Sequence, residues 1–157
     1  MTAEALHPLV AAPDADRRKL GRTAAWLAKQ VELGLATVDL TLSQYRILGL
    51  LDESSAASSH LAERLAVRPP TITAVVDGLV AKGLVERHPV EGDRRRVDHV
   101  LTAEGHRLLD AADAAIDERL HGIAAAMGDP VAADDALRGL ASWRRAFVAY
   151  SLARWGK

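Results

Sequence analysis

Apolar residues recur at helical spacing along much of this chain, beginning after a proline-containing stretch over residues 1–13 that has no helical period. From Asp14, a possible helix cap, the spacing of three and four predicts a long amphipathic helix. Its apolar positions are Leu20, Ala24, Leu27, Val31 and Leu35. Thr41 and Gln44 then fit a capping box at the start of a second helix.

The middle of the chain predicts two further helices joined by a tight turn. The first begins near His60, after a loop over residues 54–59, and the second follows Arg68 and its two prolines. Proline suits the first turn of a helix because that N–H has no intrahelical partner. Gly83 ends the second helix as a left-handed cap. The inward positions are Ile72, Val75, Val76, Leu79 and Val80, which leaves Thr71, Thr73, Ala74 and Asp77 facing outward.

A β-hairpin is predicted next. Residues 84–87 form one arm, residues 88–94 a loop with proline and glycine, and residues 95–101 a returning arm in which apolar and polar residues alternate. Three consecutive arginines, Arg94, Arg95 and Arg96, stand at the tip and on the returning arm. Guanidinium groups suit phosphate contact and narrow minor grooves of DNA.

Two long helices are predicted after the hairpin. Thr102 caps the first, and Gly128, Asp129 and Pro130 separate it from a last helix that runs from about Val131 to near Trp155. The first carries a seam with the spacing of a coiled coil: Leu109, Ala112, Ile116, Leu120, Ile123 and Met127. With the N-terminal helix, these helices offer more apolar surface than a small lobe can cover, so we expect a homodimer.

The predicted fold is therefore mainly α with a small β-hairpin wing, a winged helix-turn-helix with terminal dimerisation helices. We expect one domain over residues 1–157, with dimerisation helices at 14–40 and 102–157 and a DNA-binding lobe at 41–101. Short side chains on the second helix of the lobe could enter a major groove. The predicted DNA contacts are Ser59, His60, Arg68, Pro70, Thr71, Thr73, Ala74, Asp77, Arg94, Arg95 and Arg96.

The run LAERLAVRPPTITAVVDGLVAKGLVER, followed by DRR and then LTAEG, resembles the MarR family of bacterial transcriptional regulators between Leu42 and Gly105. The resemblance implies that Asp93 orients the wing while Arg95 reaches the minor groove. It also implies an effector pocket between the lobe and the dimerisation helices. By location, the candidates for that pocket are Trp26, Gln30, Tyr45 and Arg46.

Several of these residues have simpler interpretations. The arginine cluster could be a solvated hairpin tip, Thr71 could cap its helix, and Ser59 could be a plain N-cap. Arg64 could be solvent-exposed, or it could pair with Asp93 or hold a phosphate. The tryptophans, including Trp26, could equally pack in the core or a dimer.

The formal net charge of −1 does not by itself suggest a nucleic-acid partner. The charge is unevenly distributed, however. Residues 58–101 hold seven Lys or Arg against six Asp or Glu, whereas residues 102–142 hold three against eight. The negative charge thus lies away from the predicted reading face, and we expect steep salt dependence.

Other classes of function find little support. Cysteine is absent, which excludes disulfides, thiolate metal sites and thiol-based sensing by this chain. Neither a glycine-rich phosphate loop nor a serine elbow occurs, and the six histidines show no metal-ligand spacing. We expect no enzymatic activity, no cofactor and no metal site. Without a membrane-length apolar run or a leader, we expect a cytoplasmic protein that does not bind membranes.

The function predicted from the sequence is a transcriptional regulator that binds a palindromic operator in double-stranded DNA as a homodimer. We expect a repressor that a small-molecule effector releases. Two alternatives remain: a winged-helix module that binds protein, and a ligand-independent activator or architectural DNA binder. Neither the effector, the operator nor the sign of regulation has a signature in these residues.

Overall fold

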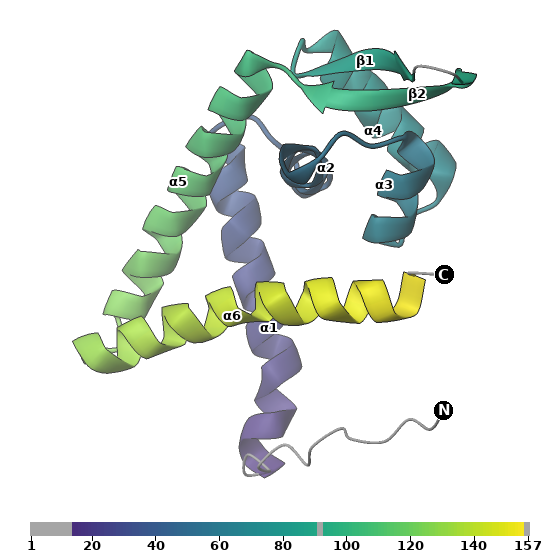
Figure 1. Cartoon of the computed structure of the whole chain (residues 1–157). Helices are drawn as coiled ribbons and strands as arrows, with labels where there is room; N and C mark the ends of the chain where they lie inside the picture. Colours follow the sequence, from purple (N-terminus) through teal and green to yellow (C-terminus); the bar gives the residue numbers. More distant parts are fainter. Residues whose placement is uncertain (1–13, 91–92, 156–157) are drawn as a thin grey trace, which may run out of the picture.

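Six helices and one antiparallel hairpin make up the computed structural model (Figure 1). It describes the backbone of residues 14–90 and 93–155, and the side chains of residues 19–90, 97–147 and 150. The elements are α1 (Asp14–Ala36), α2 (Leu42–Glu53), α3 (Ser58–Leu65), α4 (Pro69–Ala81), β1 (Val85–Val90), β2 (Asp93–Leu101), α5 (Ala103–Ala125) and α6 (Pro130–Trp155). The predicted fold class is confirmed.

Local hydrogen bonds fix three helix ends as predicted. At α2, Thr41 Oγ1 accepts from the Gln44 N–H at 3.2 Å while Gln44 Oε1 accepts from the Thr41 N–H at 2.9 Å, which completes the capping box. At α5, Thr102 Oγ1 accepts from the Gly105 N–H at 3.0 Å. After α4, Gly83 has a φ of 71°, the left-handed conformation that ends a helix.

Two caps that were considered as alternatives to DNA contact are not formed. The N-cap of α3 is Ala57, so Ser59 lies inside the first turn. The N-cap of α4 is Arg68, with an extended backbone, so Thr71 also lies inside its helix. At α4 the cause is Pro69, because a residue before proline is kept out of the helical region and the helix begins at the proline itself.

The hairpin is longer than the sequence predicts. Its strands pair from Val85 opposite Leu101 to Val90 opposite Asp93, so most of the loop predicted at 88–94 is strand. Pro89 lies opposite Val97, and the pairing shifts between Pro89 and Val90. A proline is accommodated here because a two-stranded sheet has only edge strands.

The base of the hairpin is fastened to the start of α3. Ala56, in a segment predicted as a plain loop, exchanges two backbone hydrogen bonds with His99, at 3.2 and 2.9 Å. The His99 ring is 4% exposed, and its Nδ1 lies 3.1 Å from the Ala56 carbonyl oxygen. This bridge holds β2 against the helix-turn-helix.

One apolar core joins the lobe to α5 and the end of α1. Its fully buried side chains include Leu35, Ile47, Leu48, Leu61, Val76, Leu79 and Val85. Leu109 and Ile116, predicted for the dimer seam, are buried in this core at 5% and 8% exposure. That assignment was wrong because α1 packs along α5: a Cβ on Gly34 would lie 3.3 Å from the Ile116 Cα.

The terminal helices nevertheless keep large apolar side chains in solvent. Figure 1 shows α5 descending from the hairpin to a corner with α6, which runs back beneath α2 and α3. The exposed residues of these helices and of the turn between α5 and α6 are Leu20, Trp26, Leu33, Ile123, Met127, Val131, Leu140, Trp143, Phe147 and Tyr150. None of the helices within the described residues is both long and apolar enough to cross a membrane.

Candidate nucleic-acid interface

The outward face of α4 matches the prediction. Thr71, Thr73, Ala74 and Asp77 are all exposed, whereas Ile72, Val76 and Leu79 are buried. The hydroxyl of Thr73 donates to the Pro69 carbonyl at 3.1 Å, and its methyl group remains outside that bond. The N-terminal half of α4 therefore presents a narrow surface of short side chains, the shape that enters a major groove.

A surface cavity of about 420 Å³ brings this face together with two other elements. It lies where the first turn of α3, the outward face of α4 and the hairpin meet. Its lining residues are Ala57, Ser58, Ser59, Thr73, Asp77, Arg87, Val97 and His99. Three of the predicted DNA contacts, Ser59, Thr73 and Asp77, thus share one concave surface.

Arg87 and His99 are among the lining residues that were not identified from the sequence. Arg87, on β1, forms an ion pair with Asp77 on α4 across the cavity. His99 anchors the hairpin at Ala56, as described above. The alternation of β2 already placed His99 with buried Leu101, so its inward position was predictable. The partner of Arg87 was not, because only the packed hairpin sets that distance.

The remaining predicted contacts lie around this cavity or outside the described side chains. His60, Arg68 and Pro70 are exposed but do not line the cavity. The backbones of Asp93, Arg94, Arg95 and Arg96 belong to β2. Their side chains lie outside the described residues, so their roles stay predictions.

Arg64 is held by a carboxylate inside the lobe. Its Nη2 donates to Glu53 Oε2 at 2.8 Å, and Arg144 of α6 donates to Glu53 Oε1, also at 2.8 Å. The hydrogen bonds from Arg64 and then Arg144 hold the pKa of Glu53 below its ordinary value. Arg64 thus ties α3 to α2, and the predicted pairing with Asp93 is untested.

The effector candidates are spread over the junction between the lobe and the terminal helices. Gln30 Oε1 accepts from Arg119 at 2.7 Å, and the Tyr45 hydroxyl donates to Asp113 Oδ1 at 2.5 Å. Burial, followed by the bond to Asp113, raises the pKa of Tyr45. Trp26 is 74% exposed and Arg46 is also exposed.

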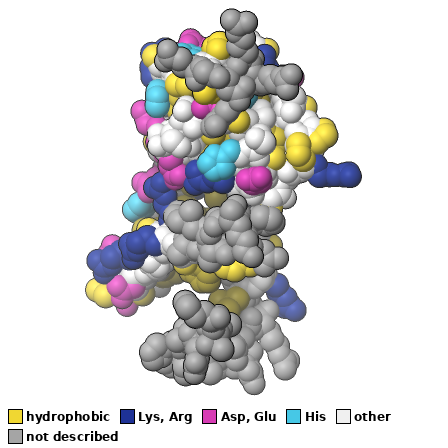
Figure 2. Space-filling model, turned by 45° about the vertical axis from the view of Figure 1, so that its right-hand side comes forward, with side chains coloured by type: hydrophobic (Ala, Val, Ile, Leu, Met, Phe, Trp, Pro, Cys, Tyr) yellow, Lys and Arg dark blue, Asp and Glu magenta, His cyan; other side chains and the backbone are white. Residues whose placement is uncertain are grey.

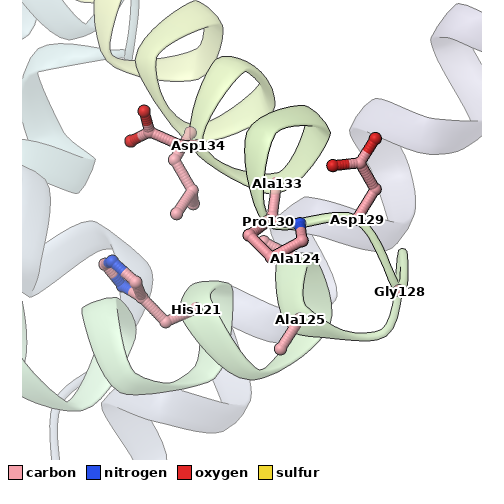
Figure 3. Close-up of a pocket in the computed structure, with 9 residues that line it drawn as sticks. His121, Ala124, Ala125, Gly128, Asp129, Pro130, Ala133 and Asp134 are labelled. Carbon is pink, nitrogen blue, oxygen red and sulfur yellow. The ribbon is translucent and has the colours of Figure 1, made fainter.

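A second cavity, of about 440 Å³, occupies the corner between α5 and α6 (Figure 3). Its lining includes three alanines and Pro130, and His121 of α5 and Asp134 of α6 flank the angle. His121 is paired along its own helix with Asp117 at 3.2 Å. Neither this cavity nor the one at α4 is lined by the four effector candidates.

Charge is mixed over the described surface. Figure 2 shows Lys and Arg side chains interspersed with Asp and Glu rather than gathered in one field. Among the described residues, no group of three or more His, Asp or Glu side chains is placed to hold a metal ion. Arginines that pair with acids in this structure include Arg64, Arg87, Arg107, Arg138 and Arg144.

Comparison with known proteins shows what the lobe is similar to. The MarR family model matches residues 38–96. The transcriptional regulator FarR of Neisseria gonorrhoeae is 33% identical over 95 residues, covering 60% of this chain and 65% of FarR. The homoprotocatechuate degradative operon repressor of Escherichia coli is 35% identical over 81 residues, covering 51% of this chain and 55% of that protein. The chain thus spans less than two thirds of the length of these relatives.

Solved structures share the fold over most of the chain. A MarR-family regulator from Rhodococcus sp. RHA1 superposes with a TM-score of 0.65 at 26% identity, covering 84% of this chain and 95% of that one. CouR from Rhodococcus jostii RHA1, solved bound to p-coumaroyl-CoA, gives a TM-score of 0.63 at 28% identity, covering 84% and 92%. The likeness includes the terminal helices as well as the lobe.

Proposed function

We propose that this chain is a sequence-specific DNA-binding regulator of transcription of the MarR type. The observation that carries the proposal is the shared surface of α4, the first turn of α3 and the hairpin, where Ser59, Thr73 and Asp77 line one cavity. This surface combines groove-sized side chains with a helix N-terminus, which favours phosphate. FarR and the Escherichia coli repressor bear names of the same function.

In this proposal each element has a separate task. The outward face of α4 enters the major groove and contacts base edges through Thr71, Thr73 and Asp77. The N–H groups of the first turn of α3, beside Ser59 and His60, approach a phosphate. The wing arginines, Arg95 above all, reach the adjacent minor groove.

We further propose that the protein acts as a homodimer on a two-fold operator. The exposed apolar residues of α1, α5 and α6 supply a surface that a second copy can cover. Two copies related by a two-fold axis present two α4 helices to successive major grooves, about 34 Å apart. The protein would act in the cytoplasm, where bacterial promoters are accessible.

Repression by promoter occupancy, relieved by a small molecule, completes the proposal. An effector releases the DNA if it binds better to a conformation with a different separation of the two lobes. CouR was solved with an acyl-CoA, which supports a small-molecule effector for this fold. In this chain the contacts Gln30–Arg119 and Tyr45–Asp113 join the lobe and α1 to α5, so they stand where such a change would act. We propose no catalytic role and no cofactor.

A mobility-shift assay on the promoter regions flanking this gene tests the proposal. The wild-type protein should shift one promoter fragment at nanomolar concentration and should lose affinity steeply as salt rises. Arg95→Ala should weaken binding and reduce the slope of log affinity against log salt by about one unit.

The matched control is Arg138→Ala. Arg138 lies on α6 and pairs with Asp134 and Asp135, far from the hairpin, so its removal should leave operator affinity unchanged. An Arg95→Ala protein that keeps wild-type affinity and salt slope would remove the wing from the interface. Failure of the wild type to shift any flanking DNA would favour the protein-binding alternative.

A further inference from the structure

Asp77 is an unexpected residue for a helix that enters a DNA groove. It is the only charged residue of α4, and it lies on the outward face one helical turn after Thr73. Its side chain is 54% exposed and lines the cavity beside the hairpin. Because phosphates repel a carboxylate, an acid at this position needs either a structural partner or a positive role in recognition.

Arg87 supplies a partner, but the pair contributes little to stability. Both side chains are about half exposed, at 47% for Arg87 and 54% for Asp77. Ion pairs as exposed as this are screened by solvent and salt and stabilise a fold only weakly. Holding the hairpin also does not require the pair, since His99 and Ala56 already fasten β2 to the start of α3.

The geometry leaves the carboxylate able to accept a second donor. Arg87 Nη2 contacts Asp77 Oδ1, and a carboxylate has about four lone-pair sites over its two oxygens. Arg87 therefore offsets the negative charge and orients the group without using Oδ2. Among the described residues only Arg87 contacts this carboxylate, so its second oxygen is a hydrogen-bond acceptor on the outward face of α4.

We propose that Asp77 is a specificity residue that accepts a hydrogen bond from the N4 amino group of a cytosine in the major groove, and that Arg87 is its positioning residue. In the major groove, cytosine presents this amino group as a donor, and aspartate or glutamate is its matching side chain. The inference rests on the proposed function, because it assigns a base to the surface proposed to read DNA. It predicts one C·G pair in each half-site opposite the third turn of α4.

The test begins with selection of binding sites from randomised DNA by the wild-type protein. Affinity is then measured on the selected operator and on versions in which each C·G pair of the half-site is replaced by the other three pairs. The wild type should lose roughly 5- to 150-fold at one such pair. Asp77→Ala should bind all four versions at that position within about twofold of one another.

Two further variants separate base reading from a structural role. Asp77→Asn keeps the shape but carries an amide, which pairs with adenine, so preference at this position should move from C·G toward A·T. Arg87→Ala should weaken binding generally and reduce discrimination at the same pair. Glu86→Ala is the matched control, because Glu86 precedes Arg87 on β1, projects from the other face of the strand and lines no part of the cavity.

The outcomes distinguish a failure of this inference from a failure of the proposed DNA-binding function. A wild type that selects no consensus overturns both. A wild-type consensus that Asp77→Ala and Asp77→Asn reproduce with unchanged discrimination overturns the inference alone, and Asp77 then only holds the hairpin. A shift of preference confined to one pair, with melting temperature and oligomeric state unchanged, supports it.

Discussion

Gly105 shows how one residue sets the junction between the wing and the terminal helices. It lies in the first turn of α5, directly against the start of the hairpin, and it is buried. A Cβ there would overlap the Leu84 carbonyl oxygen and come within 3.1 Å of Leu101 Cδ2. The Leu84 carbonyl also accepts a bond from the Thr102 N–H at 3.1 Å, so it cannot move freely. Glycine is required here for space.

Gly105→Ala should therefore destabilise the protein by about 1–3 kcal/mol, because backbone must shift to admit one methyl group. Urea unfolding followed by circular dichroism measures the change. The matched control is Gly49→Ala in α2, where no atom lies within 4 Å of the added Cβ. That substitution should be neutral or stabilise by up to about 1 kcal/mol, since alanine is the better helix former. Equal effects at both sites would contradict the steric argument.

At the scale of elements, a single carboxylate links α2, α3 and α6. Glu53 accepts from Arg64 and from Arg144 at 2.8 Å each, and its side chain is 33% exposed. Arg144 lies 91 residues away along the chain, so this contact forms only because α6 runs back beneath the lobe. The link joins the helices proposed for dimerisation to the helices proposed for DNA binding, within one chain.

Glu53→Gln should lower stability by no more than about 1 kcal/mol at neutral pH, because the pairs are partly screened. Its pH dependence is the sharper readout. Folding lowers the pKa of Glu53. The stability that its ion pairs add is therefore fully present at pH values above the pKa of Glu53 in the unfolded chain, about 4.3. That stability is lost as the pH falls through the lower pKa of the folded protein. Wild type and variant should therefore converge in acid. Glu104→Gln, which removes an exposed pair within α5, is the control. A difference in the free energy of unfolding between wild type and variant that persists in acid would contradict the role of the charge.

At the scale of the whole molecule, the terminal helices of a single chain leave large apolar side chains exposed to solvent. Their exposed apolar residues include Leu20 at 65% and Phe147 at 61%, and the Phe147 ring lies 5.8 Å from that of Trp143. Ile116 is unsuitable for testing a dimer, because it is buried in its own chain and a charge there would unfold it. The exposed positions are the informative ones.

The double substitution Leu20→Asp and Phe147→Asp should give a folded monomer that no longer binds the operator. Each buried side chain of this size contributes about 1.5–3 kcal/mol, so dimer affinity should fall by at least about a hundredfold. Sedimentation at micromolar concentration checks this. Ser43→Asp with Ser55→Asp, two exposed positions away from the terminal helices, is the matched control for the sedimentation measurement alone and should leave the dimer intact. A wild-type monomer bound one copy per operator would defeat the dimer proposal.

Sequence by itself determined the features that depend on neighbours along the chain. The caps at Thr41 and Thr102, the left-handed Gly83 and the outward face of α4 follow from local hydrogen bonds and the 3.6-residue period. The start of α3, predicted near His60, was misplaced by two residues, because the helix begins at Ser58. The N-cap of α4 has a local cause, because Pro69 excludes the preceding residue, Arg68, from the helix.

Only the tertiary structure decided which surfaces meet. Periodicity shows that Leu109 and Ile116 share an apolar face, but not that α1 covers it instead of a second chain. The partners of Asp77 and Glu53 lie on other elements, and the burial of His99 depends on a bridge to Ala56, 43 residues earlier. Such contacts depend on where whole elements pack, and packing is set by the sum of many apolar contacts that no single spacing in the sequence reveals.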